Sequence, residues 1–229
     1  MKSVVISILV AAVLAAIGAL IVVGMTSIHP RSPNSLPGAA PGLAAEDNPF
    51  ADFSMPDFQL TDQDGRSVSA EILDGRVTVL DFFFTTCPGP CPGMTAQMAY
   101  IQEQTEGTPV RLLSVSVDGD DDTPEVLRAY ASSAGADLER WTFLTGNPDD
   151  VARIVRDGLK FEISPIEDSP IYDETGAPRI GPSGKPLVNI AHPTRFILIG
   201  PDRGVIDIGS YNNPADVERL IERAKAAAG

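Results

Sequence analysis

Residues 77–94 read Val77-Thr-Val-Leu-Asp-Phe-Phe-Phe84, followed by Thr-Thr-Cys87-Pro-Gly-Pro-Cys91-Pro-Gly-Met94. The first eight residues are a run of apolar, β-branched and aromatic side chains, which is typical of a buried central strand. A helix is predicted over 92–106, because apolar side chains recur there at helical spacing. Both cysteines therefore lie between a strand and a helix, where unpaired backbone N–H groups and the helix dipole stabilise a thiolate.

The cysteines are separated by three residues, one more than in the common C-x-x-C redox motif. If the segment is helical, positions i and i+4 share one face and both sulfur atoms point to a common spot. Their Cα atoms would lie about 6 Å apart, so a disulfide is possible, but two thiolates on one soft metal ion suit this geometry at least as well. A merely stabilising disulfide would close a very short loop and gain little entropy. We therefore favour a functional cysteine pair.

Outward from this segment, strands and helices alternate. Asp122-Thr-Pro-Glu125 predicts a helix start with Asp122 as N-cap, and Asn213 is the expected N-cap of a final helix that begins near Pro214. The region from Ile163 to Leu187 is rich in Pro, Gly and Asp and is expected to be an inserted hairpin or loop. Further strands are predicted at 110–117, 141–144, 195–199 and 205–211, and a further helix at 149–159.

This order of elements, β-α-β-α-β-α-β-β-α, predicts an α/β fold. Helices that cross between strands imply a mostly parallel central sheet with helices on both faces. The last two strands flank a Gly-Pro-Asp-Arg-Gly turn at 200–204 and should form a hairpin. Roughly 180 residues are an ordinary length for one domain of this kind.

His192 is the only histidine after the N-terminal region, and it lies just before the strand predicted at 195–199. A lone histidine is usually an ordinary surface or core residue. Together with Cys87 and Cys91 it predicts a site with two thiolates and one imidazole. Thiolates favour Cu(I) and Zn²⁺, and an added imidazole also suits Cu(II). Three ligands leave the site open, which suits metal transfer better than permanent storage.

Other candidate residues are assigned structural roles. Met94 and Met98 are expected to pack in the core rather than offer thioethers to copper. The aspartates at 118 and 120–122 lack EF-hand spacing and are expected to cap a helix and solvate a loop. Asp81 lies in the buried strand, so its carboxylate needs a partner, which we expect to be an arginine or a group beside the metal site.

The N-terminal region differs from the rest of the chain. Val4 to Met25 is uncharged and as a helix would be about 33 Å long, enough to cross a bilayer. Signal-peptide apolar regions are shorter, and no small-residue cleavage site follows, so residues 1–26 are predicted to be an uncleaved signal anchor. Residues 27–49, rich in Pro, Gly and Ala, form the expected linker. Residues 50–229 then form a domain that faces the periplasm, tethered to the cytoplasmic membrane by a single pass.

The charge distribution restricts the partners. The formal net charge is −14, and all 31 acidic residues lie from Glu46 onward. Nucleic acid is a poor partner for such a surface, because phosphate binding requires clustered lysine and arginine. We therefore expect no nucleic-acid partner.

Several segments resemble the SCO/SenC family, a family of copper-binding, thioredoxin-like assembly factors of cytochrome c oxidase. The similarity covers nearly all of residues 55–227, and its most specific feature is the C-P-x-x-C-P element followed about a hundred residues later by a histidine. The segments that carry it are 58–65, 79–92, 114–118, 122–126, 141–146, His192 and 198–202.

The resemblance implies a thioredoxin-like fold tethered to a respiratory membrane. It implies copper, as Cu(I) or Cu(II), held by Cys87, Cys91 and His192 and delivered to the binuclear copper centre of cytochrome c oxidase subunit II. It further implies a periplasmic thioredoxin-like reductant and a copper donor as partners. Disulfide reduction of the target is the family's other proposed activity.

Two positions depart from the family's pattern. Residues 88–90 are Pro-Gly-Pro, where members often carry an acidic residue, and His192 is followed by Pro193 rather than Ser or Thr. Pro193 is a candidate for the cis-proline that faces the active cysteines in many thioredoxin-like reductases. Besides a copper metallochaperone, the sequence thus leaves open a thiol–disulfide oxidoreductase, in which Cys87 attacks and Cys91 resolves, and a redox or copper sensor.

Overall fold

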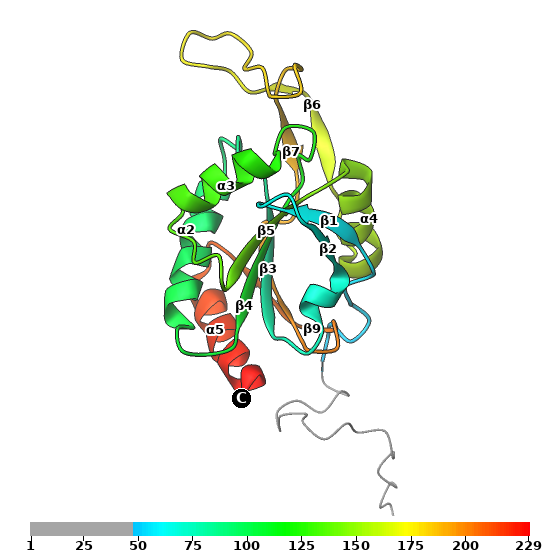
Figure 1. Cartoon of the computed structure of the whole chain (residues 1–229), viewed down its shortest axis with the longest axis vertical. Coiled ribbons are helices and arrows are strands. Elements are labelled where there is room, and N and C mark those ends of the chain that lie inside the picture. The colour runs from blue at the N-terminus through cyan, green and yellow to red at the C-terminus, as the bar shows by residue number, and fades with distance from the viewer. Residues whose placement is uncertain (1–47) are drawn as a thin grey trace, which may run out of the picture. The chain divides into compact units, whose positions relative to one another are not determined.

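The computed structural model describes residues 48–229, so the predicted anchor and nearly all of the predicted linker lie outside the described residues. In the described part, seven strands form a central sheet in the order β2-β1-β5-β4-β3-β8-β9 (Figure 1). These strands are β1 (Gln59–Asp62), β2 (Ser67–Ser69), β3 (Thr78–Phe83), β4 (Arg111–Ser116), β5 (Trp141–Thr145), β8 (Arg195–Ile199) and β9 (Val205–Ser210).

The sheet is mixed, so the prediction of a mostly parallel sheet is wrong. Strand β4 pairs in parallel with β3 and with β5, and all other pairings in this sheet are antiparallel. One reason is the β1–β2 hairpin, which the sequence analysis missed because both strands are short and partly exposed. The other is β8, which returns beside β3 in the opposite direction and continues through a turn into β9.

Helices cover both faces of the sheet, as predicted (Figure 1). Because β3, β4 and β5 are consecutive neighbours, right-handed crossovers place their two connecting helices on the same face. These helices are α2 (Cys91–Gln104) and α3 (Pro124–Ser133), and α5 (Pro214–Ala228) lies on the same face. Helix α4 (Pro148–Leu159) covers the opposite face. A short 3-10 helix, η2 (Ala70–Leu73), follows β2. None of the helices within residues 48–229 is long and apolar enough to cross a bilayer.

The core lies on both sides of β3, every residue of which is buried. Trp141 stacks on Phe143 with ring centroids 4.9 Å apart, and Phe143 meets Phe83 edge to face at 5.9 Å. On α2, Met94 and Met98 are fully buried, which confirms their predicted packing role. This core fixes the end of β3 and the start of α2, the two elements that flank the cysteines.

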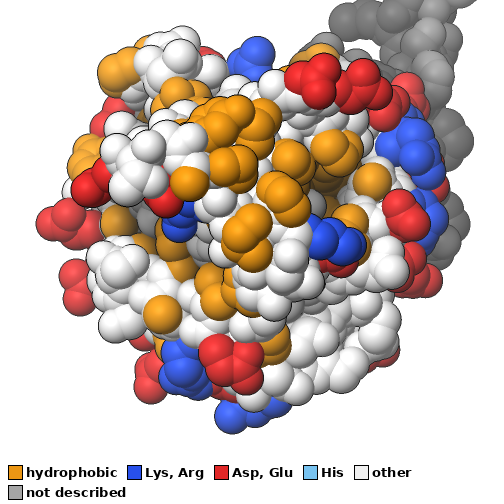
Figure 2. Space-filling view, turned by 90° about the horizontal axis from the view of Figure 1, so that it is seen from above, with side chains coloured by type: hydrophobic (Ala, Val, Ile, Leu, Met, Phe, Trp, Pro, Cys, Tyr) orange, Lys and Arg blue, Asp and Glu red, His pale blue; other side chains and the backbone are white. Residues whose placement is uncertain are grey.

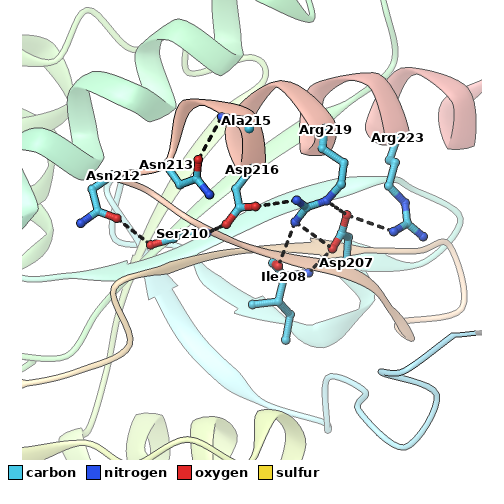
Figure 3. Close-up of polar contacts among 9 residues, drawn as sticks. All are labelled: Asp207, Ile208, Ser210, Asn212, Asn213, Ala215, Asp216, Arg219 and Arg223. Carbon is cyan, nitrogen blue, oxygen red and sulfur yellow. Dashed lines mark hydrogen bonds and ion pairs between the residues drawn. The ribbon is translucent and has the colours of Figure 1, made fainter.

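Helix α5 is fastened to the edge strand β9 by a polar cluster (Figure 3). The buried carboxylate of Asp207 on β9 accepts hydrogen bonds from Arg219 at 2.9 Å and from Arg223 at 3.0 Å. At the helix start, Asn213 accepts a hydrogen bond from the Ala215 N–H at 3.2 Å, which confirms it as the N-cap. The cluster holds the end of the sheet opposite β2 against the helical layer.

The insertion predicted between Ile163 and Leu187 is confirmed as a hairpin with a long loop. Strands β6 (Ser164–Pro170) and β7 (Val188–Ala191) form a separate two-stranded sheet. This β6–β7 hairpin projects beyond the central sheet at the top of Figure 1. Its last strand leads directly to His192, so the insertion carries the predicted imidazole ligand.

The N-cap of α3 is Thr123 rather than the predicted Asp122. The Thr123 hydroxyl accepts a hydrogen bond from the Val126 N–H at 3.4 Å. Asp122 is fully buried and bonds instead to Thr85 and Ser116, which lie on other elements. Asp and Thr are both favoured at N-caps, and the distant partners of Asp122 leave Thr123 as the cap.

Candidate metal centre

The cysteines flank the point where a loop becomes a helix. Cys91 is the first residue of α2, whereas Cys87 lies in the preceding loop, where its N–H donates to the Phe84 carbonyl oxygen at 3.3 Å. Cys87 therefore lies between β3 and α2, as predicted, and the helical i, i+4 relationship considered for the two cysteines is not formed. The reason is Pro88 and Pro90, because a proline disfavours helical backbone at the residue before it.

The structure nevertheless brings all three predicted ligands together. The sulfur atoms of Cys87 and Cys91 and a ring nitrogen of His192 lie within 4.8 Å of one another. The Cys91 Sγ and His192 Nε2 atoms are 3.4 Å apart. Donors bound at about 2.0–2.3 Å to one ion lie at most about 4.6 Å apart. Only a small contraction would place these three atoms around one metal ion.

The imidazole is oriented by its neighbours. The His192 Nδ1 atom lies 3.2 Å from the Pro193 carbonyl oxygen, which leaves Nε2 directed at the cysteines. The ring of Phe84, at the end of β3, meets the imidazole edge to face with centroids 5.8 Å apart. A hydrogen bond on the second ring nitrogen is the usual way in which a ligating histidine is held.

The two thiols are electrostatically unequal. The hydrogen bond from the Cys91 thiol, with smaller contributions from His192 and the backbone N–H groups of Cys91 and Gly89, lowers the pKa of Cys87 to about 4. The same sulfur–sulfur contact and burial raise the pKa of Cys91. The pair thus holds one thiolate and one thiol at neutral pH, and neither cysteine is in a disulfide. A thiolate is the form that binds soft metals and attacks disulfides.

Pro193 is not the cis-proline proposed from the sequence. Residues 48–229 contain no cis peptide bond, so the bond before Pro193 is trans. Its carbonyl oxygen has a different role, because it lies beside the His192 ring nitrogen that faces away from the cysteines. The analogy with thioredoxin-like reductases therefore fails at this position.

Asp81 has a partner that the sequence analysis did not identify. Its carboxylate accepts a hydrogen bond from the Ser114 hydroxyl at 2.5 Å, and the Trp141 indole N–H donates to the same hydroxyl oxygen at 2.9 Å. Within residues 48–229, no hydrogen bond or ion pair links Asp81 to an arginine or to a predicted ligand. Burial raises the pKa of Asp81 to about 7.

Two aspartates of the loop between β4 and α3 make contacts beyond the predicted capping and solvation. Asp120 is exposed and pairs with Lys185 at 3.3 Å, as a solvated loop residue would. Asp121 and Asp122 are buried and hold other segments, Asp121 through the Ser183 N–H at 2.8 Å. Burial raises the pKa of Asp122, although hydrogen bonds from Ser116 and Thr85 oppose this. Their consecutive positions gave no sign of these separate contacts.

Cys87 and His192 line a groove of about 340 Å³, and Cys91 is buried beside them. Pro88 and Pro90 form one side, and Ile166 and Ile190 from the β6–β7 hairpin form the other. Figure 2 looks down on this end of the molecule and shows hydrophobic side chains gathered there, with acidic side chains around them. The sequence analysis missed the hairpin side of the groove, because the insertion has no apolar period that would mark a binding surface.

Comparisons with known proteins agree with this site. The SCO1/SenC family model matches residues 46–229. A SCO1 protein homolog of Bacillus subtilis is 32% identical over 179 residues, which are 76% of this chain and 83% of that protein. The structure of BsSco, described as a disulfide-switch member of the Sco family of cytochrome c oxidase assembly proteins, is 29% identical with a TM-score of 0.62, and the match covers 80% of this chain and 96% of that one.

The fold is also shared with a copper-loaded structure. Bradyrhizobium japonicum ScoI with copper bound is 22% identical over 76% of this chain and 99% of that chain, with a TM-score of 0.58. At this identity the likeness concerns the thioredoxin-like fold alone. The family model is stronger evidence, because residues 46–229, which it matches, contain all three converging side chains, and the Bacillus relative is 32% identical. The chain belongs to the SCO1/SenC family.

Proposed function

We propose that the protein is a membrane-anchored copper metallochaperone that delivers copper to the binuclear centre of cytochrome c oxidase subunit II during assembly. The observation that carries the proposal is the convergence of Cys87, Cys91 and His192 at one open groove. Membership of a family whose BsSco member is described as a cytochrome c oxidase assembly protein supports the choice of target. The donor set of two sulfur atoms and one imidazole supports the choice of metal.

The site's chemistry suits copper in transit. Two sulfur donors suit Cu(I), and the imidazole adds a donor that Cu(II) accepts. The lowered pKa of Cys87 means that one ligand is already deprotonated at neutral pH, so little proton competition opposes metal binding. The groove exposes one side of the ligand set, so an acceptor's ligands can replace these one at a time. Transfer of this kind requires reduced thiols, which couples copper loading to thiol redox state.

We also propose the location and the remaining partners. Residues 1–26 would anchor the chain in the cytoplasmic membrane, with the domain in the periplasm, which confines delivery to membrane-bound acceptors. A copper donor would load the site, and a periplasmic thioredoxin-like reductant would keep both thiols reduced. The uncharged run from Val4 to Met25 supports the anchor.

The test is a titration of the reduced full chain, purified in detergent, with Cu(I) and Cu(II). We expect one tight equivalent and a thiolate-to-Cu(II) charge-transfer band. His192→Ala should weaken copper retention while both thiols stay titratable, and Cys87→Ala should abolish the band. His29→Ala is the matched control, because it removes the other histidine of the chain. Copper binding that is indifferent to His192 would refute this site.

A thiol–disulfide oxidoreductase is the second candidate. The observation that favours it is the unequal pair, with Cys87 as a ready nucleophile and Cys91 as a nearby resolving thiol. The disulfide switch described for BsSco concerns the same chemistry in a relative. Turnover of a disulfide substrate that survives His192→Ala but not Cys87→Ala would favour this activity over metal delivery.

A further inference from the structure

The chain segment that leads to the two cysteines is held by the buried carboxylate of Asp122. The Asp122 Oδ1 atom accepts a hydrogen bond from the Thr85 hydroxyl at 2.5 Å, and Oδ2 accepts from the Thr85 N–H at 3.1 Å and the Ser116 hydroxyl at 2.5 Å. Thr85 lies two residues before Cys87, after the end of β3. Three donors on one carboxylate leave this part of the chain little freedom. Asp122 therefore holds the segment from which the cysteines extend.

The insertion that leads to His192 is held by Asp121, the residue before Asp122. Asp121 is also buried, and its Oδ1 atom accepts a hydrogen bond from the Ser183 N–H at 2.8 Å, in the loop between β6 and β7. A side chain at Gly181 would overlap the same carboxylate, so the loop approaches as closely as glycine permits. Leu187, at the end of this loop, is buried and accepts a hydrogen bond from the Ile171 N–H at 2.9 Å.

The topology gives these two contacts their importance. The β6–β7 hairpin forms its own sheet, so the ladder of the central sheet does not set its position. His192 directly follows β7, whereas Cys87 and Cys91 follow β3. On the other side of His192, the ladder of the central sheet resumes at Arg195 in β8, three residues later. On the insertion side, the position of the imidazole relative to the thiols therefore depends on contacts between the insertion and the domain. Consecutive residues of a single loop contact both segments.

We propose that Asp121 and Asp122 act together as a tie that sets the position of His192 relative to the two thiols. Both are positioning residues, since neither belongs to the Cys87–Cys91–His192 ligand group. The inference rests on the proposed copper binding. Groups that orient metal ligands in this way typically change metal affinity about 10–100-fold when they are removed.

The experiment compares variants of the reduced full chain. Asp121→Ala removes the acceptor for Ser183, whereas Asp121→Asn keeps an acceptor oxygen. Asp120→Ala is the matched control, because it removes a neighbouring carboxylate whose contact with the same loop, the pair with Lys185, is exposed and screened by solvent. Two readouts are used: Cu(II) affinity with the nitrogen hyperfine coupling of the bound imidazole, and hydrogen exchange of residues 183–191 in the copper-free protein.

We expect Asp121→Ala to weaken Cu(II) binding about 10–100-fold, to reduce the nitrogen coupling and to speed exchange in residues 183–191. Asp121→Asn should restore all three, and Asp120→Ala should match the wild type. Asp122→Ala should weaken binding similarly while exchange in 183–191 stays slow. If that variant does not fold, Thr85→Val removes one of its three hydrogen bonds and should give a smaller loss in the same direction.

If Asp121→Ala binds Cu(II) with the affinity and nitrogen hyperfine coupling of the wild type, the proposed positioning role is wrong. Equal losses in Asp120→Ala would overturn it too, because an exposed acidic contact with the same loop would then matter as much as the buried carboxylates. If the wild-type chain binds no copper, the proposed function fails. Hydrogen exchange in the copper-free protein still tests the role of Asp121, since unchanged exchange in Asp121→Ala would show that this carboxylate does not hold the insertion.

Discussion

The Cys91 Sγ and His192 Nε2 atoms lie 3.4 Å apart, although 101 positions separate the two residues in the sequence. The thiol comes from the first residue of α2 and the imidazole from the end of the β6–β7 hairpin. The insertion carries the imidazole and β3 and α2 flank the two thiols, so separate parts of the chain position the two kinds of donor.

Titration of the thiols should show one group of very low pKa. We expect Cys87 to be a thiolate throughout the neutral range, with ultraviolet thiolate absorbance lost only as the pH falls toward about 4. In Cys91→Ala the main hydrogen bond to this thiolate is gone, so the pKa of Cys87 should rise toward its ordinary value. A single titration near that ordinary value in the wild-type protein would contradict this prediction.

Replacement of Asp81 should change how stability depends on pH. The pKa of Asp81 is raised to about 7 in the folded state, so the folded protein binds a proton that the unfolded chain releases between about pH 4 and pH 7. The stabilising contribution of this group is therefore present below about pH 4 and is lost as the pH rises through 7.

Asp81→Asn removes that dependence. As the pH rises from 5 to 8, the wild type should lose the contribution of Asp81 to its unfolding free energy, whereas the variant has no such contribution to lose. The stability of the variant relative to the wild type should therefore increase by a few kcal/mol at most over this range, since one pKa unit corresponds to about 1.4 kcal/mol. Urea unfolding of both proteins at the two pH values measures the change, and a difference that does not vary with pH would refute the assignment.

Loss of Asp207 should loosen the attachment of α5 to the sheet. Asp207→Ala removes the shared acceptor of Arg219 and Arg223, and we expect the free energy of unfolding to fall by about 2–3 kcal/mol. Glu222→Ala is the control, because it breaks an exposed pair with Lys225 on the same helix that is worth under about 1 kcal/mol. Equal effects of the two variants in thermal unfolding would argue against a structural role for the buried carboxylate.

A methyl group at Gly119 should be poorly tolerated. The Cβ atom of alanine would overlap the carbonyl oxygen of Gly146, so the loop that contains Asp121 and Asp122 would have to move. We expect Gly119→Ala to lower the unfolding free energy by at least about 1–3 kcal/mol. In contrast, Gly89→Ala meets only the Cys87 sulfur at 3.9 Å, an ordinary contact, and should unfold like the wild type.

The sequence predicted much of the fold because buried segments of this chain have strong local patterns. The continuous apolar run now seen as β3 and the spacing of Met94 and Met98 on α2 each describe an element and its buried face. The same patterns placed Cys87 and Cys91 between a strand and a helix. The Asn213 cap was also predictable, because its hydrogen bond is made within one turn of the chain.

Other features depended on partners distant in sequence. The short β1–β2 hairpin has little pattern of its own, and it becomes a strand pair by adding to β5. The antiparallel entry of β8 beside β3 depends on the path of the insertion, which makes the sheet mixed. The trans bond before Pro193 likewise has no signal in the local sequence.

By itself, the sequence determined which residues are chemically able to bind a soft metal: two thiols beside a helix start and one imidazole before a late strand. Only the tertiary structure decided that these three meet, that Asp81 bonds to Ser114, and that Asp122 holds Thr85 rather than capping α3. The physical reason is range. Side-chain chemistry and the periodicity of buried residues are local properties of the chain, whereas hydrogen-bond partners of buried polar groups are chosen by whichever elements packing brings within about 3 Å.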